Sequence, residues 1–422
     1  MNPSKTDRRD FLKTGAAVGV AGLTVPLLGT AVHAAGNETI KVGLIGCGGR
    51  GTGAMKDSLE ADKSIVVHAL GDFFPDRVAG FKKSLAKDYG ERVQIGERSF
   101  SGLDAYKQVL ASGPDLVILA TPPGFRPLHL EAAVKAGKHI FCEKPVAVDG
   151  PGIRKCMELV EVSKKKNIAV VSGLQRRHQA GYIETVKQIH DKAIGEVVSL
   201  RCSWNGDGIW FNQRAQNATD LEYQIKNWYH FLWLCGDHIV EQHVHNLDVG
   251  NWVMGTHPAK CTGFGGRSYR KAGVPNEVGH IWDHFAVEYT YPNGVPMFST
   301  CTHIPGIKSD ISETVYGSKG TSSVNSYRVN NKSVFNKQVV GPYVQEHIDM
   351  IQSIKAGKPL NELQSVTEST LTAIMGRMAA YSGQVVTWEQ ALNSKVEQMP
   401  AHLTTDSHIE VGPVPVPGKY KV

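Results

Sequence analysis

The sequence predicts an α/β protein with a doubly wound parallel sheet in its N-terminal part and a second domain after it. Short apolar segments alternate with helix-like segments between residues 40 and 177, as in parallel sheets covered on both faces. A glycine-rich turn follows the first apolar segment. The length of 422 residues also exceeds what one hydrophobic core normally serves, so we expect two domains.

The first 35 residues resemble a twin-arginine export signal. "TDRRDFLKTG" carries the paired arginines, and a short apolar run broken by Pro26 leads to small residues at 34–35. The run is too short to favour a membrane span, so we expect cleavage and a periplasmic protein. The alternative is an uncleaved signal that anchors the chain. The remaining boundaries are expected at 36–172, 173–400 and a tail at 401–422.

A dinucleotide-binding (Rossmann) turn is predicted next. The apolar strand 40–45 runs into Gly46, Gly48 and Gly51, and the helix-like segment 53–61 follows. Glycines at this spacing permit a tight turn, close approach of a pyrophosphate and close helix packing. A second strand, 64–72, ends in Asp72, where a carboxylate that binds the ribose is expected. Because an acid there repels a 2′-phosphate, it favours NAD over NADP.

The alternation continues to residue 177. Helices are expected at 102–112, 126–137 and 150–167, and strands at 115–123, 139–145 and 168–177. Ligands on such sheets bind outside the carboxyl ends of the strands, where "ATPP" and "EKP" stand. Lys144 is therefore expected at the nicotinamide end of the cleft. The expected cofactor contacts are Gly46, Gly48, Arg50, Gly51, Asp72, Thr121, Pro122, Glu143 and Lys144.

With these motifs the sequence resembles the Gfo/Idh/MocA oxidoreductases over about residues 38–390. The glycine turn, "GD" at 71–72, "ATPP", "EKP" and "VEQHVHNLDVGNWVMG" carry the resemblance, together with "GEVVSLRCSWN" at the start of the second domain. It implies a second α/β domain with a large, open, mainly antiparallel sheet. It also implies a nicotinamide cofactor and chemistry on polyols, sugars or sugar derivatives. Relatives often oligomerise through the open sheet face, and we expect a homo-oligomer.

The segment "CGDHIVEQHVHNLD", residues 235–248, is the expected catalytic segment. Carried over by position, the family's acid and histidine are Glu241 and His245, with Asp248 three residues further on. On one continuous helix, Asp237, Glu241, His245 and Asp248 would share a face, whereas His238 and Gln242 would point elsewhere. We assign Lys144 and His245 to proton handling, because the ordinary pKa of histidine lies near neutrality and a neighbouring carboxylate can raise it. Glu241 would orient substrate hydroxyls or His245, and Asp248 would be structural.

A metal site is the competing interpretation of this segment. His243 and His245 with nearby acids offer nitrogen and oxygen ligands. On a helix, however, residues 243 and 245 lie about 200° apart, which places them on different faces. We therefore expect no metal.

Aromatic and amide side chains upstream predict a carbohydrate cleft. The segment 204–238 is rich in tryptophan and tyrosine, including Trp228 and Tyr229, and in amides that suit sugar hydroxyls. Arg177 and Tyr182 follow a strand end and, from the resemblance, are expected near substrate. The net charge of +6 forms no basic block, which argues against nucleic-acid binding.

Export narrows the expected chemistry. The periplasm offers no obvious pool of free NAD, so we expect a tightly bound cofactor that is recycled within each cycle. The first hypothesis is hydride transfer to or from a secondary hydroxyl of a sugar, glycoside or polyol. The alternative is redox-assisted cleavage of a glycoside, by hydrolysis or elimination. The third hypothesis is a sugar- and NAD-binding protein without catalytic activity.

Overall fold

The computed structural model describes residues 39–270 and 273–421, and its first sheet has six parallel strands in the order β3-β2-β1-β4-β5-β6. This order reverses direction between β1 and β4, which places a crevice at their carboxyl ends. The strands are β1 (Ile40–Ile45), β2 (Ile65–Asp72), β3 (Ser99–Ser101), β4 (Leu116–Leu119), β5 (His139–Cys142) and β6 (Val170–Ser172).

Helices cover both faces of this sheet, which confirms the doubly wound prediction. Side chains of α1 and α2 share one apolar cluster with alternate residues of β1 and β4, whereas α3, α4 and α5 share a cluster on the other face. The helices are α1 (Gly49–Ala61), α2 (Pro75–Tyr89), α3 (Ala105–Ala111), α4 (Arg126–Lys135) and α5 (Gly150–Lys165).

Three strands are shorter than the sequence predicts, and the one expected at 139–145 ends at Cys142. The strand expected at 115–123 ends at Leu119, and the short helix η3 (Pro123–Phe125) follows, because prolines 122 and 123 have no N–H to continue the ladder. The strand expected at 168–177 contains only the three residues of β6. The short helix η4 (Gln175–His178) occupies its predicted end.

The second sheet has nine strands in the order β14-β13-β12-β11-β7-β10-β9-β8-β15. Only β7 and β10 pair in parallel, and the other pairs are antiparallel, as the resemblance implied. The strands are β7 (Val197–Gly206), β8 (Lys260–Gly266), β9 (His284–Thr290), β10 (Pro296–His303), β11 (Asp310–Gly317), β12 (Gly320–Ser323), β13 (Arg328–Val329), β14 (Lys332–Ser333) and β15 (Val386–Thr387).

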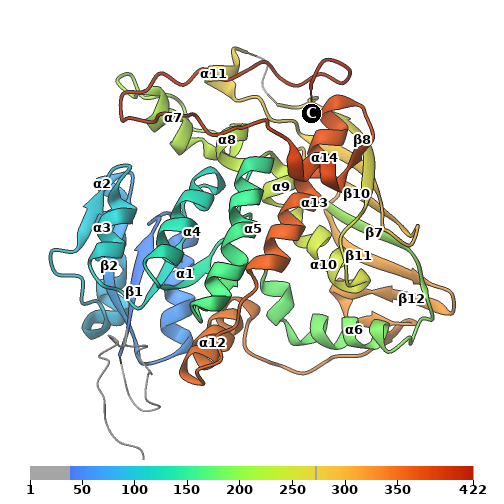
Figure 1. The fold of residues 1–422 in the computed structure, drawn as a ribbon, viewed down its shortest axis with the longest axis horizontal. Helices are drawn as coiled ribbons and strands as arrows, with labels where there is room; N and C mark the ends of the chain where they lie inside the picture. The colour runs from blue at the N-terminus through green and yellow to red at the C-terminus, as the bar shows by residue number, and fades with distance from the viewer. Residues whose placement is uncertain (1–38, 271–272, 422) are drawn as a thin grey trace, which may run out of the picture. The chain divides into compact units, whose positions relative to one another are not determined.

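Helices from the later part of the chain follow, and α9, α10 and α13 among them lie between the two sheets (Figure 1). They are α6 (Ala180–His190), α7 (Asp220–Lys226), η5 (Trp228–His230), α8 (Leu232–Cys235), α9 (His238–Glu241), α10 (Val244–Met254), α11 (Pro275–Val278), α12 (Pro342–Lys355), α13 (Leu363–Ser382) and α14 (Trp388–Asn393). The central helices α10 and α13 are almost completely buried.

Two helices from the end of the chain complete the first domain. Met350 and Ile351 of α12 belong to the apolar cluster of β1 and α1, and Leu363 at the start of α13 belongs to the cluster on the other face. The later residues of α13 pack in the second domain. Figure 1 shows α12 beside α1 and α13 running between the two sheets.

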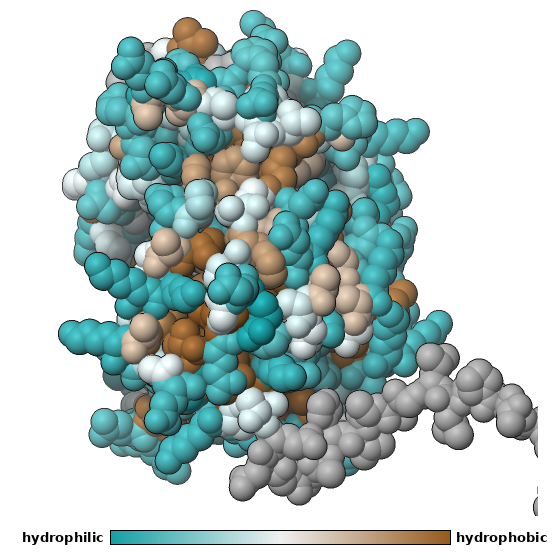
Figure 2. Space-filling view, turned by 90° about the vertical axis from the view of Figure 1, so that its left-hand side faces the viewer, coloured by the Kyte–Doolittle hydropathy of each residue, from teal (hydrophilic) through white to brown (hydrophobic). Residues whose placement is uncertain are grey.

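The segment expected as a C-terminal tail packs on the second domain. Ile409 is buried in an apolar cluster with α7 and α8, and Trp282 donates a hydrogen bond to the carbonyl of Pro415. Figure 2, which faces the first domain's edge, shows mostly hydrophilic residues with hydrophobic ones recessed among them. Within the described residues, no helix combines the length and hydropathy that a membrane span requires.

Candidate active site

One cavity of about 650 Å³ runs from the glycine turn to the catalytic segment. Gly46, Gly48 and Asp72 line one end, and Lys144 and His245 line the other. The cavity therefore joins the carboxyl ends of the first sheet's strands to helices of the second domain. Most of the predicted cofactor contacts line it: Gly46, Gly48, Arg50, Asp72, Thr121, Pro122, Glu143 and Lys144.

The three glycines of the turn have different structural roles. Gly46 has a φ of +104°, and a Cβ there would lie 2.6 Å from the backbone of Ala120, so only glycine fits. A Cβ on Gly51 would lie 1.8 Å from the carbonyl oxygen of Gly46, which makes Gly51 a packing residue away from the cavity wall. Gly48 precedes the first turn of α1 and faces open space, which suits a cradle for a pyrophosphate at a helix N-terminus.

Asp72 is held at the end of β2 by the backbone. Its carboxylate accepts hydrogen bonds from the N–H groups of Cys47 (2.7 Å) and Phe74 (2.9 Å). Burial raises the pKa of Asp72 above its usual value, and these bonds act against burial. Each oxygen keeps a lone pair for a ribose hydroxyl, so the geometry fits the dinucleotide.

Arg50 connects the glycine turn to Glu143, which follows β5, and to α12. Its Nε donates to Glu143 (2.5 Å), and its Nη2 lies 3.6 Å from the buried carboxylate of Glu346. The ring of Tyr343 lies against the guanidinium, 4.9 Å away. Tyr343 also lines the cavity, and no feature of the sequence pointed to it, because α12 lies far along the chain.

Lys144 and Glu241 form a buried ion pair in the wall of the cavity. The Lys144 ammonium donates to the Glu241 carboxylate (2.9 Å) and to the Glu241 backbone carbonyl (2.5 Å). Because an ammonium has three hydrogens, one stays available for a ligand. Glu241 thus holds Lys144 through both its side chain and its backbone.

His245 lines the cavity close to this ion pair. Burial, followed by the positive charges of Lys144 and Arg176, lowers the pKa of His245 well below its usual value. Our expectation that a neighbouring carboxylate would raise the pKa is therefore wrong, because burial and the nearby cations outweigh it. The imidazole is held neutral.

The predicted single helix over 237–248 is wrong. The chain forms α9 and α10 with a break at Gln242 and His243, where the His243 N–H donates to the carbonyl of His238, five residues back. Such a bond inserts a residue into the turn and changes the helical phase of the residues after it. Gln242, which the helical phase excluded, therefore lines the cavity.

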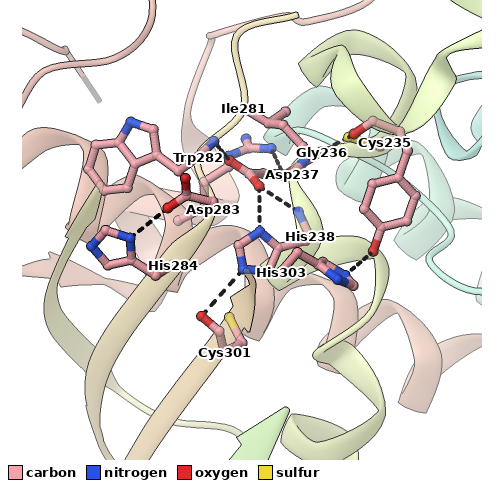
Figure 3. Close-up of polar contacts among 12 residues, drawn as sticks. Cys235, Gly236, Asp237, His238, Ile281, Trp282, Asp283, His284, Cys301 and His303 are labelled. Carbon is pink, nitrogen blue, oxygen red and sulfur yellow. Dashed lines mark hydrogen bonds and ion pairs between the residues drawn. The ribbon is translucent and has the colours of Figure 1, made fainter. Parts of the chain in front are cut away.

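Asp237 and Asp248 lie outside the cavity wall. Asp237 is buried and accepts hydrogen bonds from the backbone and ring of His238 and from the Trp282 N–H (Figure 3). Asp248 accepts hydrogen bonds from Arg177 at 2.8 to 3.1 Å and from the Ser369 hydroxyl. Both acids are therefore structural in this geometry.

The histidines of the competing metal interpretation have separate surroundings. His243 is buried and bonds to the Ser299 hydroxyl (2.7 Å), whereas His245 lines the cavity. Among residues 39–270 and 273–421, no group of three or more His, Cys, Asp or Glu residues is arranged to hold a metal ion.

The part of the cavity where we expected sugar to bind is aromatic. Trp210, Trp228 and Tyr229 line it, and Asn212 adds an amide. The expected substrate residues Arg177 and Tyr182 do not line the cavity: Arg177 pairs with Asp248, and the Tyr182 hydroxyl donates to Glu313 (3.2 Å). Both side chains belong to the packing behind the site.

Family models match both halves of the chain. Residues 40–174 match the Gfo/Idh/MocA model described as "Oxidoreductase family, NAD-binding Rossmann fold", and residues 186–393 match the model of its C-terminal α/β domain. Residues 5–25, which lie outside the described residues, match the twin-arginine translocation signal model.

Individual relatives are more distant. Inositol 2-dehydrogenase of Rhizobium meliloti (strain 1021) is 27% identical over 225 residues, which cover 53% of this chain and 58% of that protein. A glycosyl hydrolase family 109 protein of Solibacter usitatus is 31% identical over 167 residues, 38% of this chain and 37% of that protein. The matched parts thus span about half, or less, of these relatives' length.

A solved structure shows the same fold. The crystal structure of scyllo-inositol dehydrogenase from Lactobacillus casei, with bound NAD(H) and scyllo-inositol, has a TM-score of 0.63 and 17% identity. It covers 83% of this chain and all of that one.

Proposed function

Since the chain belongs to the Gfo/Idh/MocA oxidoreductase family, we propose that it transfers hydride between a bound NAD and a secondary hydroxyl of a sugar, glycoside or polyol. One observation carries this proposal: Lys144, Glu241 and His245 line the same cavity as Gly46, Gly48 and Asp72. Proton-handling groups and a dinucleotide cradle in one cavity are what oxidation of an alcohol needs.

Lys144, Glu241 and His245 have different roles at the reacting carbon. NAD, when bound, supplies the hydride acceptor. The free hydrogen of the Lys144 ammonium binds the hydroxyl oxygen of the substrate, and Glu241 fixes the ammonium in place. The imidazole of His245, which lines the cavity, takes the hydroxyl proton as the C–H bond breaks and the carbonyl forms. In the reverse direction His245 returns the proton to the oxygen.

Asp72 is proposed to select NAD over NADP. Its carboxylate is fixed beside the glycine turn and would repel a 2′-phosphate. Arg77 lines the same end of the cavity and could attract that phosphate once the acid is removed. Asp72→Ser is therefore expected to weaken NAD binding about tenfold or more while improving NADP binding. Titration of the two cofactors by calorimetry measures the ratio, and an unchanged preference would contradict the assignment.

We also propose that the cofactor stays bound in an exported protein. The twin-arginine match at residues 5–25 supports export, and that pathway carries folded, loaded proteins. Mass spectrometry and absorbance of the purified, unsupplemented protein test retention. About one NAD(H) per chain is expected, and complete absence would contradict tight binding.

Two substitutions test the catalytic assignment. Lys144→Ala and His245→Ala are expected to lower NAD-dependent turnover of polyols such as myo-inositol by about 10²–10⁴-fold while cofactor binding is kept. His190→Gln is the matched control, because His190 bonds to carbonyls of Trp252 and Val253 outside the cavity. Undiminished turnover in both catalytic variants would refute the assignment, and ligand binding without turnover in the wild type would favour a binding protein.

The second candidate function is redox-assisted cleavage of a glycoside. The 31% match to a glycosyl hydrolase family 109 protein, and a 30% match over 183 residues to 2,7-anhydro-N-acetylneuraminate hydratase of Escherichia coli (strain K12), favour it. A β-glucoside given to purified protein separates the two functions. Accumulation of a keto-sugar supports oxidation, whereas release of the aglycone without added NAD supports cleavage.

A homo-oligomer is proposed through the open face of the second sheet. Phe264 on β8 and Phe298 on β10 are 71% and 49% exposed there, which is unusual for large apolar side chains on the same sheet. Light scattering of the wild type and of Phe264→Lys with Phe298→Lys tests this. Loss of the oligomer in the double variant is expected, and an unaltered mass would exclude this face.

A further inference from the structure

Tyr229 and His303 form a hydrogen-bonded pair at the aromatic part of the cavity. Tyr229 lines the cavity from η5, and His303 ends β10 behind it. The Tyr229 hydroxyl lies 3.0 Å from His303 Nε2, and both residues are buried. No motif in the sequence pointed to His303.

The hydrogen positions in this pair follow from its neighbours. His303 Nδ1 lies 2.7 Å from the backbone carbonyl oxygen of Asp207, which can only accept. Nδ1 therefore carries the hydrogen of a neutral ring, and Nε2 presents a lone pair. The Tyr229 hydroxyl must then donate its hydrogen to His303.

Burial and a neighbouring histidine keep His303 neutral. Burial and the adjacent His238 lower the pKa of His303 to about 3. Both ring nitrogens of His238 face acceptors, Asp237 Oδ1 at 3.0 Å and the Cys301 carbonyl at 3.4 Å, which suits a ring with a hydrogen on each nitrogen. Figure 3 shows His238 and His303 beside each other, with their ring centroids 5.2 Å apart.

Proton transfer within the pair is unfavourable in both directions. Burial and the charge of Glu241 raise the pKa of Tyr229 well above its usual value, while that of His303 is lowered. The phenol therefore keeps its proton and the imidazole stays neutral, so the hydrogen bond between them keeps one direction. The pair is thus no acid or base for the reaction.

Glu241 is the other protein group near the phenol, and it is also an acceptor. One of its carboxylate oxygens binds Lys144, and the other is buried without a hydrogen-bond partner. Because the phenol hydrogen points to His303, this Glu241 oxygen keeps its lone pairs for a ligand. A ligand group placed beside Tyr229 therefore meets lone pairs on Tyr229 Oη and on the free oxygen of Glu241.

We propose that Tyr229 Oη accepts a hydrogen bond from a substrate hydroxyl, that Glu241 accepts one from a neighbouring hydroxyl, and that His303 is the positioning residue that fixes Tyr229 as an acceptor. This inference rests on the proposed polyol function and narrows its substrate class. The site takes a neutral compound with two adjacent free hydroxyls. It discriminates against an ether, a keto group or a carboxylate at the Tyr229 position. Each of these groups is an acceptor only, so it would face Tyr229 Oη with no hydrogen between the two oxygens.

Calorimetric titration with myo-inositol, D-glucose and methyl β-D-glucoside tests the proposal without requiring turnover. For the polyol that binds wild type most tightly, Tyr229→Phe is expected to raise Kd about tenfold, which corresponds to one lost hydrogen bond. His303→Leu should raise it similarly, and His303→Gln, whose amide can both donate and accept, should restore part of the affinity. Tyr291→Phe is the control, because that buried hydroxyl bonds to Asn251 outside the cavity.

The double variant separates positioning from a general structural effect. If His303 acts through Tyr229, Tyr229→Phe with His303→Leu raises Kd no more than Tyr229→Phe alone. Additive effects, or a Kd for Tyr229→Phe within twofold of wild type, would overturn the proposal while leaving the proposed function intact. If none of the three polyols binds wild type, the polyol site itself fails, and this inference with it.

A set of monodeoxy derivatives of the bound polyol locates the contact. At one ring position, removal of the hydroxyl should weaken binding to wild type about tenfold but leave binding to Tyr229→Phe unchanged. Equal losses in both proteins at every position would contradict a direct contact with Tyr229.

Discussion

At the residue scale, Arg177 shows how a residue at the right place in the sequence can serve a different purpose. Its guanidinium makes three hydrogen bonds to Asp248, whose side chain is almost fully buried. Removing one partner of such a pair leaves a buried charge without compensation. The position of Arg177 after a strand end suggested a substrate contact. In the structure Arg177 instead pairs with Asp248 on α10, behind the cavity.

Arg177→Met is expected to lower the free energy of unfolding by about 3 kcal/mol, because it leaves the Asp248 carboxylate buried and unpaired. Sugar binding by the folded variant should stay near that of wild type. Urea titration and calorimetry measure the two effects. Arg201→Met is the control: Arg201 pairs with Asp310 at the exposed surface, where less than about 1 kcal/mol is expected. A large loss of sugar affinity in Arg177→Met would return Arg177 to the substrate site.

Individual site residues were predictable where the backbone pattern alone fixes their place. Asp72 and Lys144 follow strand ends, and parallel strands bring such ends together at one edge. Gln242 and Tyr343 were not predictable in this way. Gln242 depends on a local break in hydrogen bonding, and Tyr343 depends on where a distant helix returns.

At the scale of elements, the catalytic segment shows the limit of helical phase. The residue types indicated the right chemistry, and Glu241 and His245 do line one cavity. The face they were expected to share with Asp237 does not exist, because Asp237 has a φ of +74° and precedes α9. Predicting which residues share a helix face requires regular hydrogen bonds over four residues throughout the helix. The single bond over five residues from His243 to His238 breaks this regularity.

The histidine at the end of η4 holds two later helices against the first domain. His178 contacts Asp349 of α12 (2.6 Å) and Glu362 just before α13 (3.1 Å). Burial by itself lowers the pKa of His178, but the two carboxylates outweigh it and raise the pKa to about 9. The folded state therefore binds this proton more tightly than the unfolded chain, where the pKa is about 6.5.

The stabilisation from His178 depends on pH with a definite sign. It is fully present below about pH 6.5 and is lost as the pH rises through 9, and its size is about 3 kcal/mol. We expect wild type to lose thermal stability between pH 7 and 9.5. His178→Gln should start lower at pH 7 and change less over the same range. Parallel melting curves for the two proteins would contradict this role.

At the scale of the whole molecule, the two predicted domains are less separate than their sequence boundary suggests. The last strand of the first sheet, β6, ends at Ser172, and the second sheet begins at Val197. The first domain's core is nevertheless completed by α12 and the start of α13, which lie far along the chain, beyond residue 340. Periodicity within a segment identifies an apolar helix face, but it does not say which sheet that face covers.

A fragment of residues 36–172 is therefore expected not to fold stably by itself. It lacks five apolar side chains that are at least nine-tenths buried in the full chain: Met350, Ile351, Ile354, Leu363 and Val366. At about 2 kcal/mol each, their loss removes about 10 kcal/mol, which is comparable to the whole stability of a typical domain. Circular dichroism should show no cooperative melting and calorimetry no NAD binding, whereas the chain from residue 36 to 422 shows both. Adding a peptide of residues 340–370 should restore part of the signal, since it supplies the missing helix face. A fragment that melts cooperatively near the temperature of the longer chain would show that α12 and α13 merely rest on a core that is complete without them.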